Sequence, residues 1–287
     1  MSLTTEAAPA DASATADAPA PAHQPRPQTF PRDAILSVRD VTRRFGGVNA
    51  VDRCSLDVAR GTITGLIGPN GAGKTTLFNL VTGFLHPTAG QIVFNGERID
   101  GRSPQEIFAR GMVRTFQVPR EYKSMTVLEN LVLVPAGQAG ERFWNSWFRP
   151  TLVGRQENEN IDRALEVLEY VQLSHLRDEY AANLSGGQKK LLEFARTLMA
   201  KPRMILLDEP GAGVNRTLLR RLTGYIEQLR QNMGITFFII EHDMDLVARL
   251  CNPVIVMSEG RVIMEGTPEE VRSNQQVLDA YLGGQYR

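Results

Sequence analysis

The chain has 287 residues, enough for one large domain or two small ones around a substantial buried core. Its 32 basic and 32 acidic residues balance, so it lacks the basic excess typical of nucleic-acid-binding proteins, and we expect no nucleic-acid partner. The two cysteines, Cys54 and Cys251, have no C-x-x-C spacing or His neighbour, which argues against a disulfide scaffold or a zinc site. No stretch approaches the roughly 18 uninterrupted apolar residues that a membrane-spanning helix requires.

The N-terminal residues are rich in Ala, Pro, Asp and Thr, and they lack the basic start and apolar middle of a secretory signal. We therefore expect a disordered tail at residues 1–33, followed by ordered structure. Residues 35–38 and 55–58 have the composition of strands, and the glycines of residues 43–47 indicate a turn between them. This places Phe45 on a loop, where it stacks on a nucleotide base or, alternatively, packs in the core.

A Gly-rich loop joins a short, apolar, β-branched strand at residues 62–67 to a segment with the apolar spacing of a helix. The loop follows the pattern G-x-x-x-x-G-K-T and comprises Gly68, Pro69, Asn70, Gly71, Ala72, Gly73, Lys74, Thr75 and Thr76. Its glycines let successive backbone N–H groups face inward, where they and the helix N-terminus can hold a polyphosphate. Lys74 would reach the β- and γ-phosphates and the Thr75 hydroxyl would bind Mg²⁺, whereas the plainer alternative is a tight turn.

The middle of the chain changes from strand to helix. Residues 91–96 indicate a strand and a turn, and residues 103–106 the start of a helix. A short strand at residues 112–116 ends at Gln117, and a mainly helical region follows. Within that region, residues 143–148 contain both tryptophans of the chain, so this segment either packs against a partner or anchors its own loop.

The second half alternates helices with continuous apolar strands, at residues 187–200, 204–207, 216–232 and 235–240. Such alternation indicates an α/β fold with a mostly parallel sheet that is covered on both faces. Residues 253–257 and 261–264 flank a turn like the two arms of a hairpin, and a capped helix begins at Thr267.

The strand at residues 204–207 is followed directly by two carboxylates, Asp208 and Glu209. In a parallel sheet both emerge at the carboxyl edge, which also presents the phosphate loop. Asp208 is placed to help hold Mg²⁺, and Glu209 to orient or deprotonate an attacking water. The plainer alternative is an acidic helix cap.

A second anion cradle is predicted just before the helix at residues 187–200. There a hydroxyl and two glycines follow Leu184 at the helix N-terminus, in the order Ser185, Gly186, Gly187 and Gln188. As an isolated pentapeptide this string would also fit an ordinary capped turn.

Together these motifs resemble the nucleotide-binding subunits of ATP-binding-cassette (ABC) transporters over nearly all of residues 34–284. They come in the family's order: Phe45 as base-stacking aromatic, residues 68–76 as Walker A, Gln117 as Q-loop, residues 184–188 as signature, Asp208 as Walker B, Glu209 as catalytic carboxylate, and His242 as switch histidine.

The resemblance implies a P-loop NTPase domain over residues 34–287, with an antiparallel β subdomain, a helical subdomain near residues 118–200 and C-terminal helices near residues 267–284. It also implies head-to-tail dimers, in which ATP and Mg²⁺ on one subunit's Walker A loop are covered by the other subunit's signature loop. Gln117 would contact Mg²⁺ and the γ-phosphate and pass closure on to a membrane subunit. His242 would contact the γ-phosphate, so the expected catalytic residues are Glu209, His242 and Gln117.

Several local strings resemble the ATP-binding subunits of branched-chain amino-acid importers: residues 44–47, 114–117, 126–131, 241–244 and 280–283. In that subgroup, a cytoplasmic ATPase pairs with a second ABC ATPase and attaches to the inner face of the membrane through two permeases. The permeases receive solute from a solute-binding protein. Urea and amide importers and lipopolysaccharide exporters stay open as alternatives, and so does the choice between a homodimer and a heterodimer.

The loop after Glu209 departs from the family's common Ser-Ala-Leu-Asp string, because residues 211–215 read Gly-Ala-Gly-Val-Asn. We expect catalysis to survive, since the importer subgroup resembles this chain in having an asparagine at position 215. Two alternatives belong to other functional classes: a soluble cassette ATPase acting on DNA or ribosomes, and a non-catalytic regulatory cassette. The sequence shows neither a second cassette nor zinc ligands, and its intact Lys74, Asp208 and Glu209 argue against a regulatory cassette.

Overall fold

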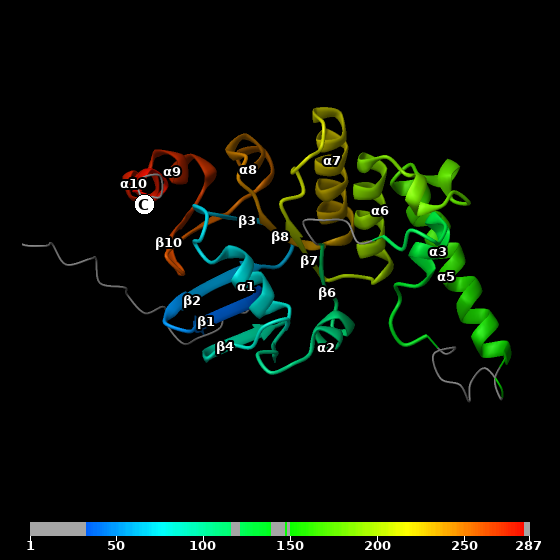
Figure 1. The fold of residues 1–287 in the computed structure, drawn as a ribbon, viewed down its shortest axis with the longest axis horizontal. Coiled ribbons are helices and arrows are strands. Elements are labelled where there is room, and N and C mark those ends of the chain that lie inside the picture. Colours follow the sequence, from blue (N-terminus) through cyan, green and yellow to red (C-terminus); the bar gives the residue numbers. More distant parts are fainter. Residues whose placement is uncertain (1–32, 116–120, 139–146, 148–149, 284–287) are drawn as a thin grey trace, which may run out of the picture.

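The computed structural model describes residues 33–115, 121–138, 147 and 150–283 (Figure 1). Three predictions fall outside the described residues: the N-terminal tail apart from its last residue, Gln117, and the aromatic segment 143–148 apart from Trp147. Within the described ranges, no helix is both long and apolar enough to cross a bilayer.

The described strands form two sheets. The first has the order β10-β9-β3-β8-β7-β6 and consists of β3 (Ile63–Ile67), β6 (Met112–Arg114), β7 (Met204–Asp208), β8 (Thr236–Ile240), β9 (Val254–Ser258) and β10 (Arg261–Gly266). The second is antiparallel, has the order β2-β1-β4-β5 and consists of β1 (Ala34–Phe45), β2 (Val48–Ala59), β4 (Ala89–Phe94) and β5 (Glu97–Arg98). The first sheet is parallel except for β10, which forms the predicted hairpin with β9. The prediction of a mostly parallel sheet is therefore confirmed.

Helices connect and flank the strands: α1 (Lys74–Val81), α2 (Pro104–Ala109), α3 (Val127–Val132), α5 (Pro150–Tyr170), α6 (Gly186–Met199), α7 (Arg216–Met233), α8 (Met244–Leu250), α9 (Pro268–Ser273) and α10 (Gln275–Gly283). Short 3₁₀ turns lie at η2 (Ser174–Leu176) and η3 (Ala181–Asn183). Four helices begin with a capping box, whose N-cap residues are Ser103, Thr126, Ser185 and Thr267. In each box a Ser or Thr hydroxyl and a Glu or Gln three residues later satisfy backbone N–H groups, so the helix start is encoded locally.

The first two strands are longer than predicted. Both span 12 residues, and they pair as far as Phe45 opposite Val48, so Phe45 ends β1 and is not a loop residue. The turn that follows includes Gly46, whose φ of 56° lies in the left-handed region that glycine tolerates best. The prediction covered residues 35–38 and 55–58, whereas pairing continues to the turn through buried residues such as Val41 and Val51 and through exposed ones, and it keeps their backbone groups hydrogen-bonded.

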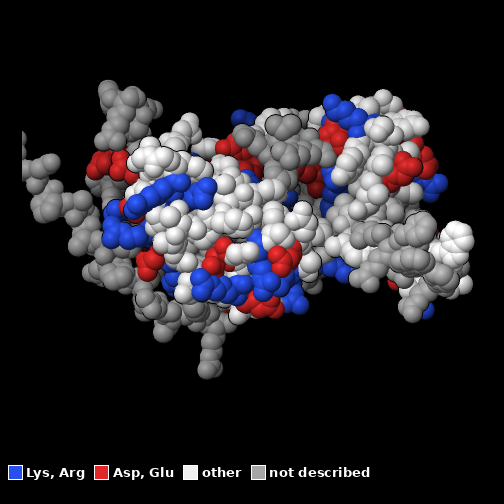
Figure 2. Space-filling model, turned by 60° about the horizontal axis from the view of Figure 1, so that its bottom comes forward, with Lys and Arg blue, Asp and Glu red and all other residues white. Residues whose placement is uncertain are grey.

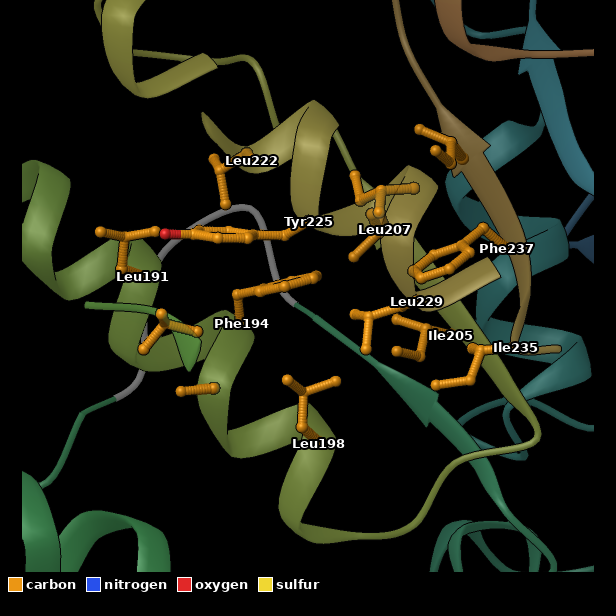
Figure 3. Close-up of a cluster of buried hydrophobic side chains, with 14 of the residues drawn as sticks. Leu191, Phe194, Leu198, Ile205, Leu207, Leu222, Tyr225, Leu229, Ile235 and Phe237 are labelled. Atoms are coloured by element: carbon orange, nitrogen blue, oxygen red, sulfur yellow. The ribbon is translucent and has the colours of Figure 1, made fainter. Parts of the chain in front are cut away.

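Alternation along the central strands divides the core between the two faces of the parallel sheet. Ile205, Leu207 and Phe237 belong to one buried cluster, which they share with apolar side chains of α6 and α7 (Figure 3). Leu206 and Phe238 belong to a second cluster, shared with α1 and the antiparallel sheet. Both faces of the sheet are therefore covered, which leaves its carboxyl edge as the place where loops can form a site.

Candidate nucleotide-binding site

The chain turns sharply between the end of β3 and the start of α1. Gly68 has a φ of 149°, and a Cβ atom there would lie 2.1 Å from the carbonyl oxygen of Met257. Gly73, the N-cap of α1, has a φ of 97°, and a Cβ atom there would lie 2.3 Å from the carbonyl oxygen of Ala50. Only glycine fits these two positions. The loop is thus packed tightly at both ends, while Gly71 at its tip is exposed.

Lys74, the first residue of α1, folds back over this loop. The residue is 6% exposed, and its Nζ donates to the carbonyl oxygens of Gly68 at 2.7 Å and Pro69 at 3.0 Å. Burial lowers the pKa of the ammonium group, and the negative charges of Glu209 and Asp208 oppose this shift. The ammonium group therefore lies over the loop and in the field of both predicted carboxylates.

Asp208, the last residue of β7, is paired with an arginine that sequence reasoning had not singled out. Arg114 Nη2 lies 2.8 Å from Asp208 Oδ2, and the two side chains are only 5% and 8% exposed. Arg114 Nη1 also donates to Asn79 Oδ1 of α1 at 2.5 Å. In the sequence, Arg114 stood only as one residue of the strand predicted at 112–116, whereas in the structure it is the last residue of β6. That place has meaning only once β6 is known to lie beside β7.

Glu209 and His242, which follow β7 and β8, lie next to each other in the structure. His242 Nε2 lies 2.7 Å from Glu209 Oε1, and both side chains are partly exposed. Glu209 has a φ of 51°, an uncommon value for a residue other than glycine. Its backbone N–H donates to the carbonyl oxygen of Ile240 at 2.9 Å, which fastens it to the end of β8. The pair can therefore act together on one group at the sheet edge.

Glu241, between β8 and His242, is a second residue that the sequence analysis did not assign. Its side chain is buried and accepts hydrogen bonds from the backbone N–H groups of Gly211 at 2.8 Å and His242 at 3.1 Å. Burial raises the pKa of this carboxyl group, and backbone hydrogen bonds, including one from Asp243, oppose the rise. The only hint of Glu241 in the sequence was its place as an acidic residue directly after a predicted buried strand.

The signature residues form a capped helix start. The Ser185 hydroxyl accepts from the backbone N–H of Gln188, while Gln188 Oε1 accepts from the backbone N–H of Ser185 at 2.8 Å. Ser185 and Gly186 are exposed. Helices α1 and α6 lie apart in the molecule (Figure 1), so one chain does not bring its signature turn to its own phosphate loop.

Phe45 lies at the surface. It is 45% exposed, and the guanidinium carbon of Arg43 lies 4.8 Å from the centroid of its ring. The alternative of a core phenylalanine is therefore wrong. An aromatic ring that is exposed and supported by a cation can stack on a base.

Residues 51–212 match the ABC transporter family, and residues 261–287 match the branched-chain amino acid ATP-binding cassette transporter family. The chain belongs to the ABC transporter family and is an ATP-hydrolysing, nucleotide-binding subunit of that class. The resemblance drawn from the ordered motifs is confirmed, and so is the α/β P-loop fold.

The relatives with similar sequences are ATP-binding proteins of branched-chain amino acid transport. The chain is 42% identical to a probable branched-chain amino acid transport ATP-binding protein, LivG, of Archaeoglobus fulgidus, over 88% of this chain and 96% of that one. It is 41% identical to the high-affinity branched-chain amino acid transport ATP-binding protein BraF of Pseudomonas aeruginosa, over 87% and 98%. Escherichia coli LivG is 39% identical over 87% and 98%.

Solved structures of ATP-binding cassettes from ABC transporters have the same fold as this chain. A nucleotide-free ATP-binding cassette from an ABC transporter superposes with a TM-score of 0.74 at 39% identity, over 86% of this chain and 98% of that one. The ADP conformation of an ATP-binding cassette gives the same TM-score of 0.74 and identity of 39%, over 87% and 99%.

The Arg114–Asp208 pair allows a test of stability. Arg114→Met should destabilise the nucleotide-free protein by about 3–5 kcal/mol, because it leaves the Asp208 carboxylate buried without its cation. Urea denaturation would measure this change. The double variant Arg114→Met/Asp208→Asn should recover part of the loss, since no unpaired charge remains. Equal stabilities of the single and double variants would show that the ion pair is not the cause.

Proposed function

We propose that the chain is the ATP-hydrolysing subunit of an importer for branched-chain amino acids. The observation that carries this proposal is the match of residues 261–287 to the branched-chain amino acid cassette family, because that segment lies outside the general cassette match at residues 51–212. The names of the relatives support the same solute. Urea or amide importers and lipopolysaccharide exporters have the same kind of cassette but carry other solutes.

ATP would bind across the phosphate loop and β1. Its phosphates would lie on the backbone N–H groups of residues 68–76, and Lys74 would donate to them in place of the carbonyl oxygens that it now contacts. The base would stack on Phe45, which is exposed at the end of β1. Positioning and electrostatics are the protein's main contribution to phosphoryl transfer.

The residues also fit a Mg²⁺ ion that accompanies ATP. Mg²⁺ in proteins commonly takes one or two carboxylates together with substrate phosphates and waters. Asp208 supplies a carboxylate at the sheet edge, and Thr75 an exposed hydroxyl in the first turn of α1. Gln117, the third expected ligand, lies outside the described residues. When bound, the ion would neutralise charge that develops on the phosphates.

Glu209 and His242 would handle the water and the γ-phosphate. Glu209 is placed to orient or deprotonate the attacking water, and His242, 2.7 Å away, to contact the γ-phosphate and fix the carboxylate. Both side chains keep some exposure, so a substrate can reach them.

A complete site would need a second ABC ATPase subunit. The signature turn at residues 185–188 stands apart from the phosphate loop of its own chain (Figure 1), and its exposed helix N-terminus suits an anion. Two chains arranged head to tail would place each signature turn over the other chain's ATP. This argument applies equally to a homodimer and to a heterodimer.

A cleft of about 580 Å³ suits contact with permease subunits. Its lining includes apolar side chains from three segments that follow α1, form α2 and follow α3, among them Phe84, Phe108 and Ala136. Phe84 is half-exposed, as expected of a surface that another protein covers. Through permeases the chain would attach to the cytoplasmic face of the membrane and act, indirectly, with a solute-binding protein.

The face over β4 and α2 carries basic and acidic side chains side by side (Figure 2). Ion pairs join Arg98 to Asp100, Arg102 to Glu106 and Arg110 to Glu97 in this part of the chain. This face therefore does not present the continuous basic surface that a nucleic-acid backbone favours. The observation favours transport over action on DNA or ribosomes.

The solute can be tested by uptake. Deleting the gene for this chain in its source organism should abolish high-affinity uptake of radiolabelled leucine and leave urea uptake unchanged. The wild-type gene should restore uptake, whereas the Lys74→Ala variant should not. Loss of urea uptake with normal leucine uptake would favour the urea or amide importer instead.

Lys74→Ala should weaken Mg-ATP binding by about 10–100-fold, because it removes a charge-assisted hydrogen bond to the phosphates. Isothermal titration calorimetry on the purified full chain measures this loss. Lys123→Ala, at an exposed lysine away from the loop, is the matched control and should keep wild-type affinity. Unchanged affinity in Lys74→Ala would contradict the proposed phosphate site.

Glu209→Gln should bind ATP normally, lower phosphate release by about 10²–10⁴-fold and accumulate as a closed dimer with ATP. Size-exclusion chromatography with ATP and a phosphate-release assay report the two effects. Glu227→Gln, at an exposed position of α7, should behave as wild type in both assays. Full turnover in Glu209→Gln would exclude Glu209 as the residue that activates water.

A further inference from the structure

Two loops leave the carboxyl edge of the sheet next to each other and carry the residues proposed for hydrolysis. Residues 209–211 follow β7, and residues 241–243 follow β8. These strands are parallel neighbours, and their last residues, Asp208 and Ile240, are paired. The backbone N–H of Glu209 donates to the Ile240 carbonyl oxygen at 2.9 Å, so pairing continues one residue beyond β7.

Beyond that point a buried carboxylate links the two loops. Glu241 is 5% exposed. Its Oε1 accepts from the backbone N–H of Gly211 at 2.8 Å, and its Oε2 accepts from the backbone N–H of His242 at 3.1 Å. One oxygen thus binds the loop after β7, while the other binds the loop after β8. Because the carboxylate is shielded from water, both hydrogen bonds are stronger than they would be at the surface.

The link requires a close approach at position 211. A Cβ atom on Gly211 would lie 2.9 Å from Glu241 Oε1, so a larger residue would push the carboxylate away. Two residues earlier, Glu209 has a φ of 51°, a conformation that persists only where the surroundings fix it. The bonds to Ile240 and Glu241 flank Glu209 on both sides and supply that constraint.

We propose that Glu241 is a positioning residue for ATP hydrolysis. Its carboxylate fastens the loop after β7 to the loop after β8, and thereby fixes the Glu209 and His242 side chains 2.7 Å apart. The inference rests on the roles proposed above for Glu209 and His242. Glu241 acts through these two residues and not on the nucleotide.

Steady-state ATP hydrolysis by the full chain tests this role. Glu241→Gln keeps the size of the side chain but replaces one accepting oxygen with an NH₂ donor, which must then face a backbone N–H. We expect kcat to fall by about 10–100-fold and the KM for ATP to change by less than about threefold, because the phosphate loop and Phe45 are untouched. Gly211→Ala, which displaces the same carboxylate from the other side, should give the same selective loss of kcat.

A control variant distinguishes an effect on the position of the catalytic side chains from a general loss of stability. Asp57→Asn breaks the Arg39–Asp57 ion pair, whose atoms lie 2.8 Å apart in the antiparallel sheet. It should lower stability but keep the kcat of the folded protein within about twofold. The inference is overturned if Glu241→Gln and Gly211→Ala reduce kcat no more than Asp57→Asn does.

The Glu209→Gln variant separates a failure of the proposed hydrolysis site from a failure of the role proposed for Glu241. If that variant retains turnover, the proposed site itself is wrong, and the inference falls with it. If Glu209→Gln stops hydrolysis while Glu241→Gln and Gly211→Ala keep wild-type kcat, the site stands and only the role of Glu241 is refuted.

Discussion

The register of three parallel strands places the phosphate loop, the two carboxylates and the histidine of this site. β3, β8 and β7 are neighbours, with Leu66 paired to Ile240 and Ile240 paired to Asp208. Parallel strands end at the same edge of a sheet, so the loops that follow these three strands begin at one level although they are distant in sequence. The phosphate loop, the carboxylates and the histidine therefore meet without long connecting segments.

Several charged groups lie at the carboxyl edge of the parallel sheet, and burying any one of them without a partner would cost free energy. Lys74, Asp208 and Glu241 are all buried. The partners of Lys74 are backbone carbonyl oxygens, that of Asp208 is Arg114, and those of Glu241 are backbone amides. Such partners orient each group before the nucleotide arrives, which is how a preorganised site lowers a barrier. The stability of the folded chain and the proposed ATP hydrolysis consequently depend on the same contacts.

Local sequence patterns were sufficient for the fold class and for groups whose role depends on their immediate neighbours. The loop ending in Lys74 and the acidic residue at the end of β7 are of this kind, because spacing and strand direction define them. Arg114 and Glu241 are different, since Arg114 pairs with Asp208 of β7 and Glu241 reaches Gly211 in the loop after β7, and the strand order that brings them together is not visible in a local pattern. Phe45 was misplaced for a related reason: the length of β1 depends on its pairing with β2.

The asparagine at position 215 also becomes intelligible in this arrangement. Its side chain is the N-cap of α7 and accepts from the backbone N–H of Leu218 at 2.9 Å. An aspartate would cap the helix equally well, so capping alone does not select asparagine. The difference is charge. Burial raises the pKa of Glu241, and the negative charge of Glu209 adds to that rise. The neutral cap therefore starts α7 without a further negative charge in the loop that follows Glu209, and Glu241 binds that same loop through the Gly211 amide.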